Sequence, residues 1–309
     1  MTSLVEVARH LPSTEPVAAL QEPLGLNDLQ LRRFTRLYGL DQICKAPEES
    51  ETELLLAAAR GLDSLRGNEH RVRYVVRGKG LRTTAPYPHS PLQRVRDELG
   101  LGHARGFGVA DHGCATGLLA IDVCDTLLSA DGDPEAMALI LTGEKTFTPF
   151  TQWVTDVSIM GEGTAAVLVR AGGERDRMLG YASRIYGRAD GVIDMNAEVA
   201  ADARKIYQDV LAEVVLAAVT EAGLELDDID LLLPHNVNRV SWTVAADNLG
   251  IPKRKLFMDN LPRTGHCFCA DPFINYRSVV DGGVLRPGDR YLMTSVGLGQ
   301  TFAAMVFQH

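Results

Sequence analysis

The stretch Gly106-Phe-Gly-Val-Ala-Asp-His-Gly-Cys-Ala-Thr-Gly-Leu-Leu-Ala120 decides the fold, because it joins a strand to a helix through a turn of small residues. The apolar run Gly106–Ala110 predicts a short strand, and the turn Asp111–Gly117 follows it. Apolar positions at helical spacing then predict a helix over Leu118–Leu128. Ala138–Thr142 is a continuous apolar run, which is typical of a strand buried on both faces.

The second half of the chain repeats this order. Leu256–Met258 predicts a strand, a turn with Gly265 and His266 follows, and Phe273–Asp281 predicts a helix. Thirty residues separate Gly113 from Gly143 in the first unit, and 32 separate Gly265 from Gly297 in the second. The similarity predicts a duplicated α/β unit, with a reactive-looking residue where each strand end meets a helix start. Open α/β sheets bind their ligands at such places.

Composition places the chain among ordinary globular proteins. Its 309 residues allow one large domain or two, and 46% of them are hydrophobic against 23% charged. Its 31 basic and 40 acidic residues give a net charge of −9, which argues against a nonspecific binder of nucleic acid or of an anionic membrane.

The start of the chain and the cysteines indicate the compartment. The first ten residues contain Glu6, Arg9 and His10, so they do not form the apolar h-region of a secretory signal, and no run of 18 apolar residues is present. We therefore expect no membrane span and a cytoplasmic location. The cysteines are odd in number, five, without C-x-x-C spacing, so we expect free thiols in a reducing compartment.

Cys114 is the first candidate for chemistry. It lies at a predicted helix N-terminus, where the helix dipole and free N–H groups stabilise a thiolate, and its neighbours are small. The alternative, a buried structural cysteine, suits Cys124 better because Cys124 is surrounded by apolar residues in mid-helix.

Two histidines and one carboxylate are candidates for acid–base work. His235 follows an apolar strand and Pro234, and His266 follows Gly265 in a turn. Either could be a general acid or base, and either could be an ordinary turn histidine. Asp271 could orient one of them, or could simply cap the following helix.

The sequence gives less support to a metal site or a nucleotide-phosphate site. The run His266-Cys-Phe-Cys269 offers three potential metal ligands, but its spacing fits structural zinc poorly, so we expect no metal. No G-x-G-x-x-G or P-loop pattern is present, which argues against a nucleotide-phosphate site. Gly297-Leu-Gly299 is either a bare turn or a source of backbone N–H groups for an oxyanion.

In this order, the motifs resemble the β-ketoacyl-acyl carrier protein synthase III family of the thiolase superfamily. The turn around Cys114 resembles its cysteine motif, Leu233-Pro-His-Asn-Val-Asn238 its P-H-Q-A-N motif, and Ile159–Leu168 its G-D-G-A-x-A-x-V-L segment. Leu285–Asp289 and Ser295–Gly299 resemble its G-D turn and closing glycine loop. The similarity runs over nearly the whole chain.

The resemblance implies an α/β, thiolase-like fold with two similar βαβαβαββ halves, residues 1–175 and 176–309, in five αβαβα layers. It implies a homodimer and an acyl-Cys114 intermediate, formed from an acyl carrier protein or coenzyme A thioester without a bound cofactor. Backbone N–H groups of Cys114 and of Gly297–Leu298 would hold the oxyanion. His235 would act on the second, acceptor substrate. The implied substrate-binding residues are Asn238, Phe150 and Trp153.

One departure from the family concerns the second-half turn, where the family has G-N-T with a catalytic asparagine. This chain has Thr264-Gly-His266, so the asparagine is absent, and His266 or Gly265 takes its place depending on the alignment. A Cys-His-His set resembles elongating ketosynthases, which decarboxylate malonyl thioesters. A Cys-His-Asp set with Asp271 resembles offshoots that move an acyl group onto oxygen or nitrogen. The sequence leaves both open.

A second departure concerns substrate entry. The family's coenzyme A clamp contains a tryptophan that the matching stretch Arg33–Gly39 lacks, and the segment between Tyr186 and Ala203 is shorter than the family's substrate loop. These features favour a carrier-protein arm. Carrier proteins are acidic, so we expect a local basic patch of Arg32, Arg33 and Arg36. The remaining alternatives are a non-catalytic, tunnel-shaping partner subunit, which the retained Cys114 and His235 disfavour, and a thioester hydrolase.

Overall fold

A computed structural model describes residues 1–81, 90–154, 156–187 and 197–309. Nine strands form one mixed sheet in the order β11-β12-β13-β10-β1-β9-β6-β4-β5. The strands of its first half are β1 (Thr2–His10), β4 (Val72–Gly78), β5 (Arg105–Val109), β6 (Met137–Thr142) and β9 (Thr164–Ala171). Those of its second half are β10 (Arg177–Ile185), β11 (Leu231–Pro234), β12 (Arg290–Gly297) and β13 (Thr301–Gln308). A single residue pair, Ser3 with Arg177, joins β1 to β10 between the halves.

The two halves are built alike. In the first, β4 pairs in parallel with β5 and with β6, and in the second, β11 pairs in parallel with β12. The predicted strand Leu256–Met258 is wrong, because Leu256 makes only one parallel bridge, to Leu232. A helical turn at Lys253–Lys255 precedes it and α8 (Leu261–Thr264) follows closely, which leaves no room for a longer strand. This bridge nevertheless occupies the place that β5 has in the first half.

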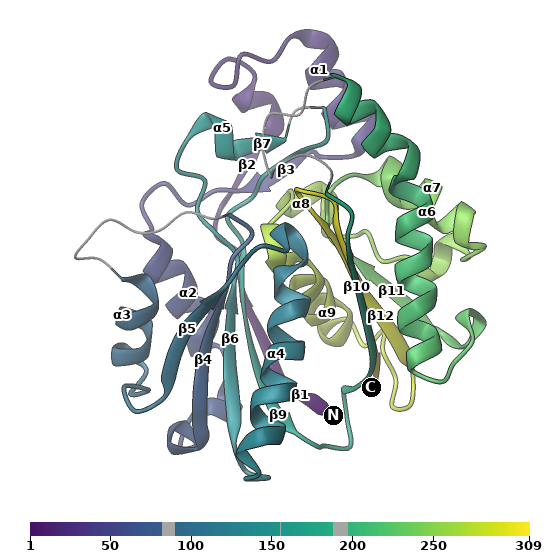
Figure 1. The fold of residues 1–309 in the computed structure, drawn as a ribbon. Coiled ribbons are helices and arrows are strands. Elements are labelled where there is room, and N and C mark those ends of the chain that lie inside the picture. Colours follow the sequence, from purple (N-terminus) through teal and green to yellow (C-terminus); the bar gives the residue numbers. More distant parts are fainter. Residues whose placement is uncertain (82–89, 155, 188–196) are drawn as a thin grey trace.

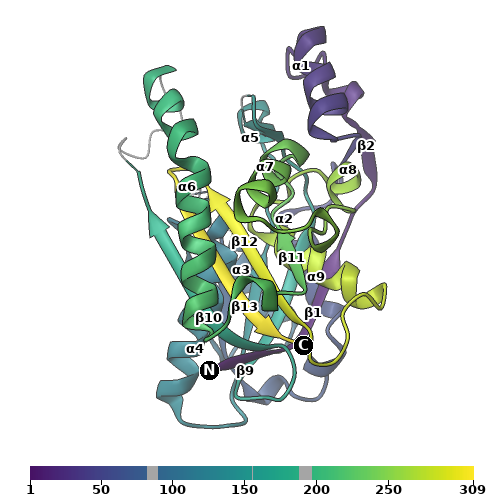
Figure 2. The same ribbon diagram turned by 90° about the vertical axis from the view of Figure 1, so that its right-hand side faces the viewer.

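The helices complete five layers (Figures 1 and 2). The outer layers are α2 (Glu51–Arg60) with α3 (Pro91–Glu98), and α6 (Ala197–Glu221) with α7 (Arg239–Leu249). The middle layer is α4 (Thr116–Asp131) and α9 (Asp271–Asp281), each of which contacts strands of both halves. The predicted α/β class and five-layer αβαβα arrangement are confirmed. The boundary between residues 175 and 176 lies in the connection from β9 to β10, and its role as a domain boundary stays a prediction.

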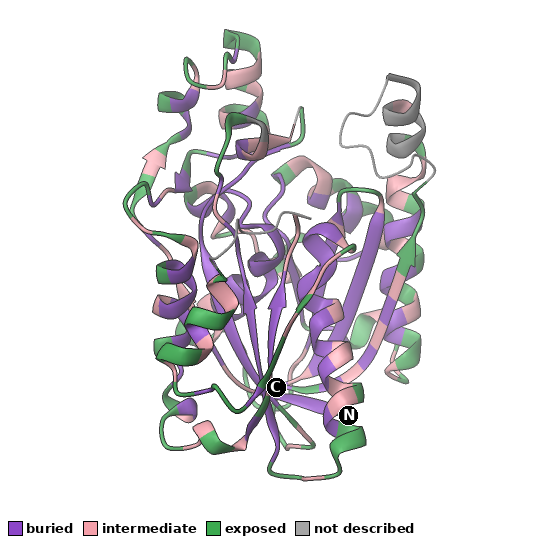
Figure 3. Cartoon of the chain, turned by 60° about the vertical axis from the view of Figure 1, so that its left-hand side comes forward, coloured by how far each residue is buried: buried purple, intermediate pink, exposed green. Residues whose placement is uncertain are grey.

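Burial follows these layers (Figure 3). The strands are largely buried, whereas the outer helices expose one face. The helical segment Gly113–Asp131 is long and apolar enough to cross a membrane by composition alone. Leu118, Ile121 and Cys124 of this segment belong to the core between the two halves of the sheet. Its apolar character is therefore explained by its place in the middle layer.

Short elements gather at the end of the sheet where α4 begins, at the top of Figure 1. They are β2 (Thr14–Pro16), α1 (Asp28–Arg32), the π-helical η2 (Arg33–Tyr38), β3 (Gln42–Cys44), α5 (Pro149–Gln152), β7 (Trp153–Val154) and β8 (Ser158–Ile159). The remaining short turns are η1 (Val17–Leu20), η3 (Asp63–Leu65), η4 (Glu69–Arg71), η5 (Gly113–Ala115), η6 (Leu226–Asp228), η7 (Lys253–Lys255) and η8 (Phe268–Ala270).

Candidate active site

The cysteine turn connects β5 to α4. Cys114 lies in the helical turn η5, directly before α4, and its side chain is buried. Asp111 and Gly113 have positive φ angles of 78° and 52°, which makes the turn tight. A Cβ on Gly113 would lie 2.8 Å from the backbone nitrogen of Leu298, so only glycine permits this approach. The turn places the Cys114 thiol at the N-terminal end of the middle-layer helix, as the sequence predicted.

His266 connects Cys114 to Asp271. Its Nε2 lies 3.0 Å from Cys114 Sγ, and its Nδ1 lies 2.5 Å from Asp271 Oδ2. All three side chains are buried. The sequence left open whether the candidate residues form a Cys-His-His or a Cys-His-Asp set. In the structure His266 is the residue beside the thiol and Asp271 lies behind it, so the three form a Cys-His-Asp set.

The surroundings of His266 favour its charged form. Burial lowers its pKa, but the negative charges of Cys114 and Asp271 and their hydrogen bonds outweigh burial and raise the pKa to about 10. A cationic imidazole beside a thiol favours the thiolate. The geometry therefore places a cationic imidazole beside the Cys114 thiol.

Asp271 is fixed by a buried polar chain. Its Oδ1 accepts a hydrogen bond of 2.8 Å from the Cys267 N–H, and its Oδ2 accepts one of 2.6 Å from the Asn236 N–H. Asn275 donates to Asn236 Oδ1 at 2.9 Å and to the Pro234 carbonyl at 2.7 Å. Sequence reasoning gave Asn236 and Asn275 no role. The signal was the i, i+4 spacing of Asp271 and Asn275, which puts both on one face of α9.

His235 lies next to His266 but in a different environment. Its ring centroid is 5.3 Å from that of His266 and 5.2 Å from that of Trp242. Its Nδ1 is buried and has no hydrogen-bond partner among the described residues. Burial, reinforced by the charge of His266, holds the pKa of His235 well below its usual value. The environments of the two neighbouring histidines therefore shift their pKa values in opposite directions, which favours the charged form of His266 and the neutral form of His235.

The glycine turn after β12 packs on the cysteine turn. A Cβ on Gly297 would lie 2.1 Å from the His112 carbonyl and 2.9 Å from the Cys114 nitrogen. The backbone around Gly297 and Leu298 therefore borders the backbone of the cysteine turn, including the Cys114 nitrogen, and its role as an oxyanion site stays a prediction.

The predicted substrate-binding residues have different surroundings. Asn238 accepts a hydrogen bond from the Ser241 N–H at the start of α7 and donates to the Val157 carbonyl at 3.2 Å. Trp153 packs edge-on against Phe34, with ring centroids 6.2 Å apart. The side chain of Phe150 lies outside the part of the chain that the structure describes. Their substrate contacts stay predictions.

The predicted basic patch lies on α1 and η2. Arg32 and Arg36 are exposed, and Arg33 forms an ion pair of 2.7 Å with Asp156. Arg239, which sequence reasoning did not select, lies against the end of η2, because a Cβ on Gly39 would be 2.8 Å from its guanidinium. Most of the segment between Tyr186 and Ala203 lies outside the described residues.

The cysteine–histidine run at 266–269 does not converge on one point. His266 faces Cys114, whereas Cys267 Sγ lies 3.6 Å from the Thr264 carbonyl and Cys269 Sγ lies 3.4 Å from the Gly78 carbonyl. Within the described ranges, no three His, Cys, Asp or Glu side chains are grouped to hold a metal ion.

Comparison with known proteins gives the family context. Residues 219–309 match the family model described as 3-oxoacyl-[acyl-carrier-protein (ACP)] synthase III C terminal. The chain is 27% identical to the β-ketoacyl-[acyl-carrier-protein] synthase III of Rhodospirillum rubrum over 320 aligned positions, which cover 96% of this chain and 95% of that protein. It is 26% identical to the enzyme of the same name from Rhizorhabdus wittichii over 233 positions, 70% of each chain. The chain is therefore similar to β-ketoacyl-[acyl-carrier-protein] synthase III along nearly its whole length.

Solved structures show the same fold as this chain. The 3-oxoacyl-[acyl-carrier-protein] synthase III of Aquifex aeolicus superimposes with a TM-score of 0.81 at 20% identity, over 100% of both chains. ChlB3, which is named an acyltransferase, superimposes with a TM-score of 0.87 at 20% identity, over 99% of this chain and 97% of its own. The chain therefore has the fold of these two proteins.

Proposed function

We propose that this enzyme forms an acyl-Cys114 thioester and transfers the acyl group to an oxygen or nitrogen nucleophile without decarboxylation. The observation that carries the proposal is the position of His266, which contacts the Cys114 thiol through Nε2 and the Asp271 carboxylate through Nδ1. A histidine held in this way can take a proton from a nucleophile and return it to a leaving group.

The first half-reaction is acyl loading. The Cys114 thiolate attacks the carbonyl carbon of a phosphopantetheine or coenzyme A thioester, and the developing oxyanion is placed near the backbone N–H groups of Cys114 and Leu298. The carbon–sulfur bond to the donor breaks, and the His266 proton passes to the departing thiolate. The products are the free donor thiol, acyl-Cys114 and a neutral His266.

The second half-reaction returns the site to its starting state. Neutral His266 removes the proton of an acceptor alcohol or amine, which attacks the acyl-Cys114 carbonyl. The Cys114 thiolate leaves, and the proton stays on His266. Asp271 stabilises the imidazolium each time it forms. These steps use only side chains and backbone of this chain, so we expect no resident cofactor.

The charge on Asp271 is the reason to prefer transfer over condensation. A decarboxylative condensation forms an enolate, and a buried carboxylate behind the catalytic histidine adds negative charge next to it. An alcohol or amine, in contrast, must lose a proton to a base, and the carboxylate makes His266 a stronger base.

One observation favours a second candidate, decarboxylative β-ketoacyl synthesis. His235 is neutral, lies beside His266 and has no carboxylate partner among the described residues, so it could donate a hydrogen bond to an enolate. In the transfer reaction, the neutral His235 ring would form a hydrogen bond to the acceptor alcohol or amine. A non-catalytic role in a tunnel-shaping subunit is disfavoured because the whole Cys-His-Asp set is assembled.

A single-turnover chase separates the candidates. The enzyme is loaded with an acyl-coenzyme A, and the acyl adduct is verified by intact mass spectrometry. The acylated enzyme is then mixed with ethanolamine or with malonyl-carrier protein. We expect loss of the adduct with formation of an acylated ethanolamine, and no carbon dioxide from the malonyl thioester. Carbon dioxide with a β-ketoacyl product would contradict the proposal and establish condensation, and loss of the adduct to water alone would establish a hydrolase.

The donor carrier and the assembly are part of the proposal. Exposed Arg32 and Arg36, together with Arg239 beside η2, support docking of an acidic acyl carrier protein. The outer edge of β5 pairs with no other strand of the described chain, which supports a homodimer formed along this edge. A light-scattering mass of twice 33.6 kDa is expected, and a monomer would contradict it. The cytoplasmic location stays a prediction.

A further inference from the structure

Two backbone hydrogen bonds tie His266 to a neighbouring segment. The His266 N–H donates to the Ile159 carbonyl at 3.0 Å, and the Gly161 N–H donates to the His266 carbonyl at 2.9 Å. Met160 and His266 thereby form a parallel bridge, although neither belongs to a longer shared ladder. We call residues 159–163 the strap. The strap is therefore hydrogen-bonded to both backbone polar groups of His266.

The side chains of the strap alternate. Gly161 and Gly163 pack closely on the turn that carries His266, residues 264–267, which we call the catalytic turn. A Cβ on Gly161 would lie 2.0 Å from the Thr264 carbonyl, and a Cβ on Gly163 would lie 2.8 Å from Cys267 Sγ. Glu162, between them, points to the other side, as expected for an extended backbone. One face of the strap therefore packs on the catalytic turn, and the Glu162 side chain extends from the opposite face.

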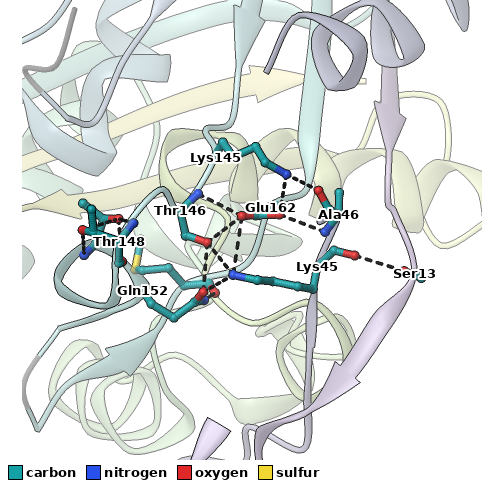
Figure 4. A network of polar contacts seen from close by, with 10 residues as sticks. Ser13, Lys45, Ala46, Lys145, Thr146, Thr148, Gln152 and Glu162 are labelled. Atoms are coloured by element: carbon teal, nitrogen blue, oxygen red, sulfur yellow. Dashed lines mark hydrogen bonds and ion pairs between the residues drawn. The ribbon is translucent and has the colours of Figure 1, made fainter. Parts of the chain in front are cut away.

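The Glu162 carboxylate is the centre of a buried polar network (Figure 4). It accepts hydrogen bonds from the Ala46 N–H at 2.8 Å and the Thr146 N–H at 2.9 Å, and the Thr146 hydroxyl lies 2.6 Å away. The ammonium groups of Lys45 and Lys145 lie 3.6 and 3.4 Å from it. Glu162 is 1% exposed, so each of these contacts replaces water that the carboxylate has lost.

A second set of contacts holds Met160 in the same strap. The Met160 N–H donates to the Gln152 carbonyl at 2.7 Å, and the Gln152 amide donates to the Met160 carbonyl at 2.6 Å. The Gln152 side-chain oxygen also accepts from Lys45 and from the Thr146 hydroxyl. The network therefore fixes the strap on the side opposite the catalytic turn.

We propose that Glu162 is a positioning residue of the active site, which fixes the strap and thereby holds His266 at hydrogen-bonding distance from Cys114. The proposal rests on the proposed function, because it concerns the same Cys114–His266 pair. Glu162 does not touch the reacting atoms. Its loss leaves two lysines without their shared counter-charge, so we expect the strap to shift and the Cys114–His266 contact to loosen.

The test measures the reactivity of Cys114, which does not require an acyl substrate. Each variant is treated with iodoacetamide over a range of pH, and the rate of Cys114 alkylation is followed by mass spectrometry. We expect Glu162→Gln to slow alkylation at neutral pH by about tenfold, because a small displacement of a catalytic group has effects of at least this size. The difference should shrink at high pH, where the thiol ionises without help.

Controls separate a positioning role from general destabilisation. Glu53→Gln removes an exposed carboxylate that caps α2 and should leave the alkylation rate unchanged. Gln152→Leu loosens the strap without changing charge and should slow alkylation as Glu162→Gln does, and it decides the matter if Glu162→Gln does not fold. Folded Glu162→Gln or Gln152→Leu protein with the wild-type alkylation profile would overturn the inference. If the wild-type thiol reacts no faster than that of His266→Ala, the proposed Cys114–His266 pair itself is wrong.

Discussion

Cys114→Ala enzyme is expected to form no acyl adduct with any acyl-coenzyme A or acyl-carrier thioester. The physical reason is that the described chain has only one thiol that lies both at the start of a helix and beside a cationic histidine. Burial raises the pKa of the Cys124 and Cys269 thiols to about 12, so neither is a thiolate at neutral pH. Intact mass spectrometry after incubation with the thioester measures the loss.

Cys124→Ala is the matched control for this loss. Cys124 lies in the same helix as the cysteine turn and is buried, so its replacement perturbs the middle layer in a similar way. The Cys124→Ala variant should load at the wild-type rate once its folding has been checked by thermal unfolding. An adduct that persists in Cys114→Ala and is mapped to another cysteine would show that the nucleophile has been misassigned.

Asp271→Asn is expected to lower the rate of acyl transfer by about 10⁴-fold, as removal of the carboxylate from a triad does elsewhere. The carboxylate is one of the two negative charges that keep the pKa of His266 high. An asparagine in its place gives up that charge and turns an amide towards Nδ1 or towards the Cys267 and Asn236 N–H groups. Single-turnover rates of loading and of transfer to ethanolamine measure the effect.

The pH profile and a matched control show whether the rate loss in Asp271→Asn comes from the missing charge beside His266. Because the charge of Asp271 raises the pKa of His266, its removal should move the loss of the imidazolium to lower pH and narrow the range in which loading is fast. Asp281→Asn removes a carboxylate from the other end of α9, where it pairs with Arg277, and should leave both rates unchanged. A folded Asp271→Asn enzyme with the wild-type rate and pH profile would show that His266 does not depend on this carboxylate.

The sequence was sufficient for the parts of the fold that are encoded locally. The small residues around Cys114 predict the turn, and the glycines at positions 39, 132 and 250 end helices in left-handed backbone conformations. β10 was missed because Gly180 and several polar residues interrupt its apolar pattern, and its strand partners, β13 and β1, are distant in sequence. Such pairing is fixed by the assembled sheet and leaves only a weak local signal.

The candidate site shows the same limit. His266 and Asp271 are five residues apart, so their contact could be anticipated from one turn and the helix after it. The contact of His266 with Cys114 spans 152 positions, and it was expected only from the resemblance to the synthase III family. The Glu162 network could not be anticipated, because Lys45, Thr146 and Gln152 come from separate segments that meet only when the strap is in place.

The most direct test of the account is a pH titration of the two histidines, observed by nitrogen NMR of the histidine-labelled wild-type enzyme and assigned with His235→Gln and His266→Gln variants. The account predicts that between about pH 6 and pH 9 the ring of His266 stays protonated, whereas that of His235 stays neutral. A His266 ring that is neutral over this range, or a His235 ring that carries the proton instead, would contradict the assignment of His266 as the histidine that serves Cys114.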